Sequence, residues 1–169
     1  IYTNTIPNFD GISRVYDEQQ MTVSGRWFLH YVSGIYGYMQ NPMLIGVLAM
    51  FFLAVAAVLT VNLFSVKNNT IAGAWGLLSV LTPAIAYTNT YTFTAAAYCF
   101  SILLAVMAVW LAANKGYRGF LIGCIALALS MGIYQVYVTV AITLSLYLVL
   151  GKALEEGSTV WETFLSGVR

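Results

Sequence analysis

Long uncharged runs of apolar residues, separated by short polar turns, make up most of the chain. Residues 44–66 contain 23 residues without a charge, and about 20 apolar residues in a helix are enough to cross a bilayer. Further uncharged runs follow at 71–86, 94–113 and 119–150. Within each run the apolar residues are nearly continuous rather than alternating, which is typical of membrane-spanning helices. The pattern therefore predicts an all-α polytopic membrane protein.

The last of these runs is too long for one span. As a single helix its 32 residues would extend roughly 48 Å at 1.5 Å per residue, against a bilayer core of about 30 Å. Gly132-Ile133-Tyr134-Gln135 interrupts the run, which favours two helices over 119–132 and 136–150, with one long helix left open as the alternative. We therefore expect about five transmembrane helices, some of them short or broken.

Composition and the positions of the charges support this interpretation. The chain is 60% hydrophobic and 8% charged, with a mean hydropathy of +0.81, whereas soluble domains carry about 25% charged residues. With five spans, Lys67, Lys115, Arg118 and Lys152 all fall on one side of the membrane. The positive-inside rule makes that side cytoplasmic. The net charge of only +1 gives no reason to expect a nucleic-acid partner.

On this topology the chain divides into three regions. Residues 1–40 are polar and aromatic and are predicted to lie outside the cell, 41–151 to form the transmembrane bundle, and 152–169 to lie against the cytoplasmic face of the membrane. The sequence begins at Ile1 without a Met and has no span before the external region. We therefore expect it to be a piece of a larger chain.

A short amphipathic helix is predicted at the end of the external region. Ser24 can cap a helix that starts near Gly25. The side chains that follow form an apolar stripe at helical spacing, which is typical of a helix lying in the outer membrane interface. The stripe consists of Trp27, Phe28, Tyr31, Val32 and Ile35.

A polar and aromatic segment, YTNTYTF at residues 87–93, interrupts the apolar runs; we call it the aromatic segment. It shares the external side with the 132–135 turn, and the short spans beside both should leave them below the membrane surface. Non-helical backbone at that depth must face protein or water, which favours a cavity for a neutral, hydroxyl-rich ligand such as a sugar. Tyr and Thr also gather at interfaces and between helices without a ligand, and that interpretation stays open. The candidate cavity residues are Tyr87, Asn89, Tyr91, Tyr134 and Gln135.

Charged side chains of the external region are candidates for acid–base catalysis and for phosphate binding. Asp17 or Glu18 beside a membrane cavity can act as a general base, and Arg14 or Arg26 can hold a phosphate through paired hydrogen bonds. From residue types alone, an ordinary solvated loop in which these acids pair with these arginines is the more common explanation of the same residues. His30 is the single histidine, so no dedicated metal site is predicted, although a divalent cation at the acidic pair is left open.

Four short motifs, taken in order, resemble those of one family. An acidic pair at 17–18, Ser24-Gly25-Arg26-Trp27, the aromatic segment after a Pro-containing span, and Gly132-Ile133-Tyr134-Gln135 are similar to the motifs of the bacterial polytopic glucosyltransferases that modify O-antigen. These enzymes belong to the GT-C class. The resemblance covers the whole chain. It implies a glycosyltransferase of the inner membrane that moves a hexose, usually glucose, from a polyprenyl-phosphate carrier to a cell-surface glycan on the external face.

The resemblance also implies roles for individual residues. Asp17 is expected to be the essential acidic residue of the external loop, accepting the proton of the acceptor hydroxyl, with Glu18 beside it. Arg26, together with Arg14, is expected to meet the donor phosphate. The sugar is expected to lie against the candidate cavity residues, and the prenyl chain between spans. Retention or inversion at the anomeric carbon is left open.

Two other classes of protein fit part of the pattern. A transporter or lipid-linked sugar flippase would also need a polar cavity lined by short, broken spans. Residues 68–114 and 119–151 contain no charge, however, and ion-coupled transporters usually place ionisable groups in the membrane. A structural membrane subunit would use its aromatic residues as interface anchors alone. Dependence of turnover on one external acid distinguishes the enzyme from both.

Overall fold

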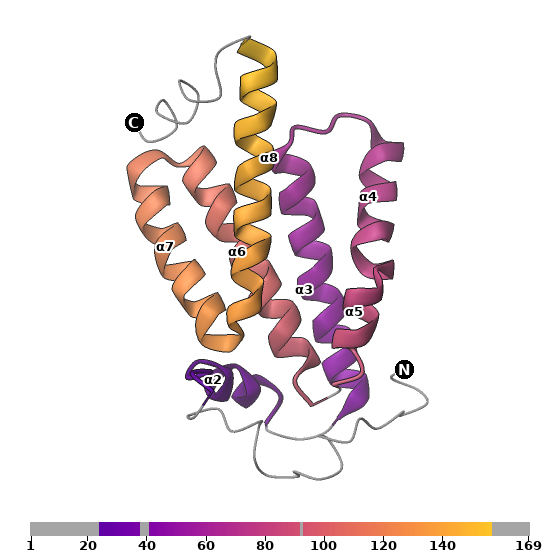
Figure 1. Cartoon of the computed structure of the whole chain (residues 1–169). Coiled ribbons are helices and arrows are strands. Elements are labelled where there is room, and N and C mark those ends of the chain that lie inside the picture. The colour runs from indigo at the N-terminus through magenta and orange to yellow at the C-terminus, as the bar shows by residue number, and fades with distance from the viewer. Residues whose placement is uncertain (1–23, 38–40, 92, 157–169) are drawn as a thin grey trace.

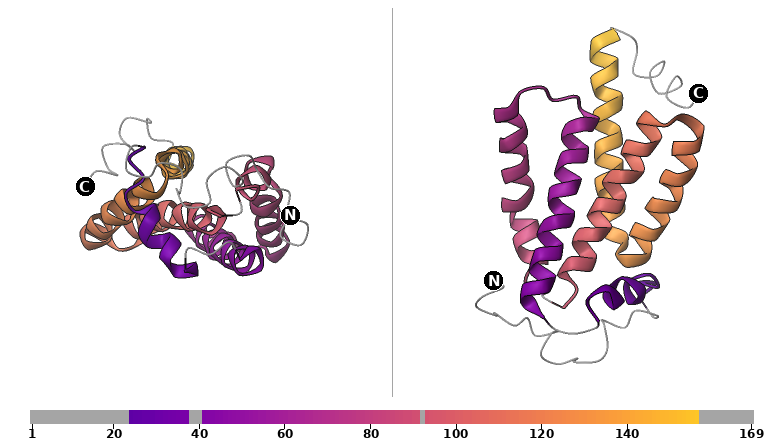
Figure 2. Two further views of the ribbon diagram at one scale, coloured as in Figure 1. Left: turned by 90° about the horizontal axis from the view of Figure 1, so that it is seen from below. Right: turned by 180° about the vertical axis from the view of Figure 1, so that it is seen from behind.

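The structure of the protein, a computed structural model, describes residues 24–37, 41–91 and 93–156. All regular elements among these residues are helical, which confirms the predicted all-α fold (Figure 1). Two short elements lie across one end of a bundle of longer helices, as the view from below shows (Figure 2). The short elements are α2 (Leu29–Ser33) and the 3-10 turn η1 (Gly34–Tyr36), and the bundle contains α3 (Pro42–Leu63), α4 (Asn69–Leu81), α5 (Pro83–Thr88), α6 (Ala95–Asn114), α7 (Gly116–Ile133), the 3-10 turn η2 (Gln135–Tyr137) and α8 (Val138–Glu156).

Successive long helices run in opposite directions (Figures 1 and 2). Among the described residues, four helices are long and apolar enough to cross a membrane: α3, α6, α7 and the η2–α8 segment Gln135–Leu154. The run 119–150 is therefore two helices, as its length predicted. α7 ends because Tyr134 takes an extended conformation, with φ −157° and ψ 115°. The α5–α6 connection and the α7–α8 turn consequently share the end of the bundle that carries α2.

The run 71–86, predicted as one span, is broken. Thr82 is extended, with φ −65° and ψ 142°, because a residue before proline is driven out of the helical region and Pro83 follows. Pro83 then starts α5, since proline is favoured in the first turn of a helix. α5 continues to Thr88 and so makes the first two residues of the aromatic segment helical, where non-helical backbone was predicted.

The predicted interfacial helix is also corrected in detail. α2 begins at Leu29 with Phe28 in the cap position and no side-chain cap bond, so Ser24 does not cap it. The predicted stripe divides between two faces. Val32 is buried with Leu29 in the core that reaches α6 and α7. Three other residues of the stripe are exposed: Trp27, Tyr31 and Ile35.

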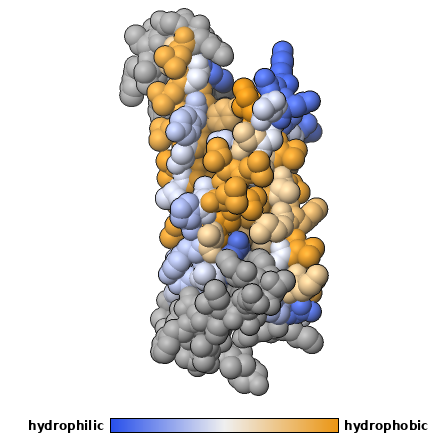
Figure 3. Space-filling view, turned by 90° about the vertical axis from the view of Figure 1, so that its right-hand side faces the viewer, coloured by the Kyte–Doolittle hydropathy of each residue, from blue (hydrophilic) through white to orange (hydrophobic). Residues whose placement is uncertain are grey.

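The opposite end of the bundle carries basic residues. Lys67 and Lys115 lie in the α3–α4 and α6–α7 connections, and Lys152 lies in the last turns of α8. At this end Trp110 Nε1 donates to Asn62 Oδ1 at 2.6 Å, which ties α6 to α3. On the face that carries α4, apolar residues cover the middle of the molecule and hydrophilic residues lie at this end (Figure 3). The distribution is that of a membrane protein with its short-loop cations gathered at one end.

α6 is the central helix, and α7 approaches it closely. A Cβ added at Gly123 would lie 2.7 Å from the backbone oxygen of Ala108, so only glycine permits this distance. Nearer the α2 end, Ser101 and Ser130 are fully buried against each other. Each hydroxyl donates to the other residue's backbone carbonyl oxygen at 2.9 Å. Small residues and buried hydroxyls of this kind hold helices together where lipid removes the hydrophobic driving force.

Replacing Ser130 by Ala tests this contact. The change removes a buried interhelical hydrogen bond and leaves a partner group unsatisfied, so we expect a loss of about 0.6–2 kcal/mol in unfolding free energy. Equilibrium unfolding of the protein in detergent or bicelles measures this change in free energy. Ser145→Ala, an exposed serine on α8, is the matched control. Equal stability of the two variants would contradict the importance of the serine pair.

Candidate functional site

Two segments far apart in the chain meet at the α2 end of the bundle. The backbone N–H of Phe28 donates to the carbonyl oxygen of Gly132 at 2.8 Å. The side-chain Nε2 of Gln135 donates to the carbonyl oxygen of Ser24 at 3.0 Å. The Ser24–Trp27 motif therefore lies directly on the Gly132–Gln135 turn, a contact that the sequence did not predict.

Glycines make this contact close. A Cβ at Gly132 would lie 2.7 Å from Cε2 of Trp27, so the indole ring packs where a side chain would stand. Gly25 has φ +74°, and a Cβ there would lie 2.9 Å from Nε2 of Gln135. The left-handed conformation favours glycine. The two motifs therefore fit each other through their glycines.

This contact places Arg26 over Tyr134. The guanidinium Cζ lies 4.6 Å from the centroid of the Tyr134 ring, within the range of a cation–π interaction. Nη1 of Arg26 donates to the hydroxyl of Tyr98 at 3.2 Å. The Tyr98 and Tyr134 rings are stacked, with centroids 5.0 Å apart and planes inclined by 23°. A half-buried cation is thus held by one tyrosine ring and one tyrosine hydroxyl.

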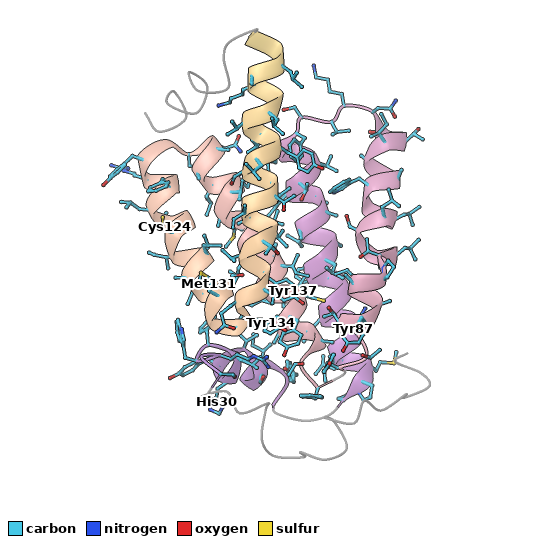
Figure 4. All side chains as sticks on the ribbon, in the orientation of Figure 1. His30, Tyr87, Cys124, Met131, Tyr134 and Tyr137 are labelled. Atoms are coloured by element: carbon cyan, nitrogen blue, oxygen red, sulfur yellow. The ribbon has the colours of Figure 1, made fainter. Side chains whose placement is uncertain are left out.

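Tyr137 completes what we call the tyrosine cluster, formed by Tyr98, Tyr134 and Tyr137. Its ring stands edge-on to Tyr98 and Tyr134, with centroid distances of 6.2 Å and 5.6 Å. Its hydroxyl lies 3.4 Å from Oγ1 of Thr88, at the end of α5. Figure 4 shows Tyr134 and Tyr137 together where α7 meets α8. The cluster therefore joins α6, the α7–α8 turn and the start of the aromatic segment.

The other cavity candidates form a separate group. Tyr87 is 63% exposed, and its hydroxyl lies 2.8 Å from that of Tyr91. The two rings meet edge-to-face at 5.4 Å, on the α5 side of the same end of the bundle (Figure 4). Asn89 is only 4% exposed. The structure thus brings Tyr134 and Gln135 to the arginine segment and leaves Tyr87 and Tyr91 as a hydroxyl-linked pair.

Sequence reasoning missed Tyr98, Tyr137 and Thr88. Tyr98 and Tyr137 lie inside or beside apolar runs, where a tyrosine also serves as an interface anchor. One signal was available: Tyr98 falls in the first turn of the predicted span 94–113, at the same membrane level as the aromatic segment.

Four further residues singled out in the sequence are Asp17, Glu18, Arg14 and His30. Asp17, Glu18 and Arg14 lie outside the described residues. His30 is exposed on α2, with its ring edge-on to Tyr31 at 5.9 Å. Within the described part of the chain, no group of three or more His, Cys, Asp or Glu side chains is placed to hold a metal ion.

Comparison with known proteins gives one decisive result. The model of the family described as Glucosyl transferase GtrII matches residues 1–169, the whole chain. The chain belongs to the GtrII glucosyl transferase family. No curated protein and no solved structure matches the chain.

Membership of the GtrII family confirms the resemblance drawn from the four motifs. It makes the chain a membrane protein of a glucosyl transferase family, which has to recognise a sugar donor and an acceptor. For such a protein, an arginine on a cluster of tyrosines at a bundle end is a chemically suitable place for an anionic, sugar-bearing ligand.

The ring of Tyr134 can be tested apart from its hydroxyl. Tyr134→Phe keeps the aromatic face under Arg26, and we expect glucosyl transfer within about twofold of wild type. Tyr134→Leu removes a cation–π contact of about 1–2 kcal/mol, and transfer should fall by about fivefold or more. Assays in membranes measure both, with Tyr147→Leu, an exposed residue of α8, as control. Equal activity of the Phe and Leu variants would contradict a role for the ring.

Proposed function

We propose that the protein transfers a hexose, glucose in the first instance, from a polyprenyl-phosphate carrier to a cell-surface glycan. The reaction takes place at the external face of a bacterial inner membrane, by a GT-C type enzyme. The observation that carries this proposal is the position of Arg26 on the tyrosine cluster. This site lies at the end of the bundle opposite the basic residues Lys67, Lys115 and Lys152, and the positive-inside rule makes the end that carries the site external.

Arg26 suits the phosphate of a lipid-linked donor. A guanidinium has five N–H donors, so it can bond the hydroxyl of Tyr98 and a phosphate at the same time. The phosphate of a polyprenyl carrier lies at the bilayer interface with its chain in the apolar core. Arg26 lies at the level where α7 ends and α8 begins, which are helices long and apolar enough to span. The charge of Arg26 and its level in the membrane therefore both suit the phosphate of a polyprenyl carrier.

Tyrosine rings nearby suit the sugar. Aromatic faces cover the apolar faces of a hexose, and hydroxyls bond its polar edges. Tyr134 lies next to the arginine, and the exposed Tyr87 with Tyr91 offers a second aromatic surface at the same end. Asn89, expected as a further contact, is buried, so the tyrosines are the stronger candidates.

The transfer step we propose uses Asp17 as general base, with Glu18 beside it. The acceptor hydroxyl oxygen attacks the anomeric carbon, and the bond from that carbon to the phosphate oxygen breaks. The hydroxyl proton passes to Asp17, and the electron pair of the broken bond leaves with the lipid phosphate. Arg26 stabilises the charge on the departing phosphate, which is the kind of electrostatic help that often dominates catalysis. Inversion at the anomeric carbon follows from this single displacement.

The proposed general base is tested by the variants Asp17→Asn and Glu18→Gln. The membrane-embedded protein is supplied with radiolabelled polyprenyl-phosphate-glucose and a glycan acceptor, and transfer of the label is measured. Loss of a general base typically costs about 10²–10⁴-fold in rate, so Asp17→Asn should abolish measurable transfer while donor binding persists. Glu18→Gln should retain more activity. Unchanged transfer in both variants would place the base elsewhere. Movement of donor between leaflets without any transfer would favour a flippase instead.

The phosphate contact is tested by Arg26→Ala. A hydrogen bond to a charged group contributes about 1.5–3 kcal/mol, so affinity for polyprenyl phosphate should fall by about tenfold or more. Arg26→Lys should recover part of the loss, because lysine keeps the charge without the planar fork. Arg118→Ala removes the same residue type at the other end of the bundle and should bind normally. Equal weakening by both Ala variants would contradict a specific site at Arg26.

A further inference from the structure

We propose that Gln135 and Gly132 are positioning residues that orient Arg26 for the donor phosphate. This inference rests on the proposed function. It gives Gln135 a role through Arg26 instead of the direct sugar contact expected from the sequence.

The contacts between the two motifs are in register. Ser24 is bonded by Gln135, Arg26 lies over Tyr134, and Phe28 is bonded to Gly132. The two segments therefore run antiparallel, with Arg26 midway between two hydrogen bonds. A residue whose backbone is held two positions before and two positions after has little freedom in where its side chain begins.

The bond from Gln135 is well defined chemically. The acceptor is the backbone carbonyl oxygen of Ser24, at 3.0 Å, and a carbonyl accepts only from a donor. The amide nitrogen of Gln135 must therefore face Ser24. A Cβ at Gly25 would meet this nitrogen at 2.9 Å, so the amide lies against the backbone that leads into Arg26.

Gly132 fixes the other side of the arginine. Its carbonyl oxygen accepts from Phe28, and the absence of a side chain admits the Trp27 ring. An alanine would place its Cβ 2.7 Å from that ring, and the ring and the backbone beside Arg26 would have to move. Gly132 thus leaves room for the ring of Trp27, the residue that follows Arg26 in the chain.

Fixing the arginine before the donor arrives favours binding. A free arginine side chain has many rotamers, and ordering one of them on binding costs conformational entropy. A guanidinium already held over Tyr134 and against the Tyr98 hydroxyl has lost most of that freedom. Such preorganisation raises affinity without a new contact to the ligand.

The experiment uses polyprenyl phosphate without the sugar as a competitive probe of the phosphate site. In the membrane-embedded protein, Gln135→Ala removes a single neutral hydrogen bond. The inhibition constant of polyprenyl phosphate should therefore rise by about three- to tenfold in this variant. The KM for the donor should rise in parallel, with kcat within about twofold. Val136→Ala, an exposed neighbour, is the control and should match wild type.

A double-mutant cycle separates positioning from direct contact. If Gln135 acts through Arg26, adding Gln135→Ala to Arg26→Ala should change the inhibition constant by less than about twofold, because residues acting as a unit are not additive. If Gln135 touches the sugar directly, the donor KM effects will multiply and the probe will bind Gln135→Ala as it binds wild type. That second result would overturn the proposal.

Gly132→Ala gives an independent arm. It should weaken binding of the probe, and adding Trp27→Leu should restore part of the loss by making room for the new methyl group. An unchanged loss in the double variant would contradict the role of Gly132. Gln135 is exposed, so its variants decide the proposal even where Gly132→Ala does not fold.

Comparison of wild type with these variants also separates failure of the positioning role from failure of the proposed function. If wild type neither binds polyprenyl phosphate nor transfers glucose from its derivative, the proposed function fails, and the positioning role fails with it. If wild type and Arg26→Ala behave as proposed but Gln135→Ala matches Val136→Ala, the positioning role alone is overturned.

Discussion

The close packing of α6 against α7 is the contact on which the candidate site depends. Gly123 lets the two backbones approach at Ala108, and Ser101 and Ser130 bond each other nearer the α2 end. These contacts fix how far α7 descends beside α6. The stacking of Tyr134 on Tyr98 is a consequence, because one ring follows the end of α7 and the other lies in the first turns of α6.

Breaks in the helices free the polar backbone groups that join separate segments at the α2 end of the bundle. Backbone that leaves the helix inside a membrane protein must find polar partners in the protein or in water. The break at Tyr134 exposes the carbonyl oxygen of Gly132 to the N–H of Phe28, and the break at Thr82 turns α5 so that Thr88 meets Tyr137. The places where the apolar pattern fails are therefore the places where separate segments join.

Within the described part of the chain, the guanidinium of Arg26 lies among neutral aromatic rings, and the proposed function assigns it to the phosphate of a lipid-linked donor. A guanidinium is more weakly hydrated than an ammonium and stacks on rings, so it tolerates the half-buried position over Tyr134. The Tyr98 hydroxyl that Arg26 bonds is uncharged, so in the proposed function it does not compete with the guanidinium for the phosphate. The family match, glucosyl transferase, gives this combination of charge and aromatic surface a chemical purpose.

The sequence by itself determined the apolar helices α3, α6, α7 and α8, the division of 119–150 and the gathering of basic residues at one end, although the span expected at 71–86 is broken at Pro83. These depend on local composition and length, because each helix satisfies its own backbone in lipid. It also gave the four motifs on which the family resemblance rested. Local rules misled at Ser24, where a capping role was expected and a long-range bond from Gln135 was found. The tertiary structure alone decided that Arg26 lies on Tyr134 and that Tyr98, Tyr137 and Thr88 belong to the site. Contacts between residues so distant in the chain depend on how closely the helices pack, and no single segment of sequence carries that information.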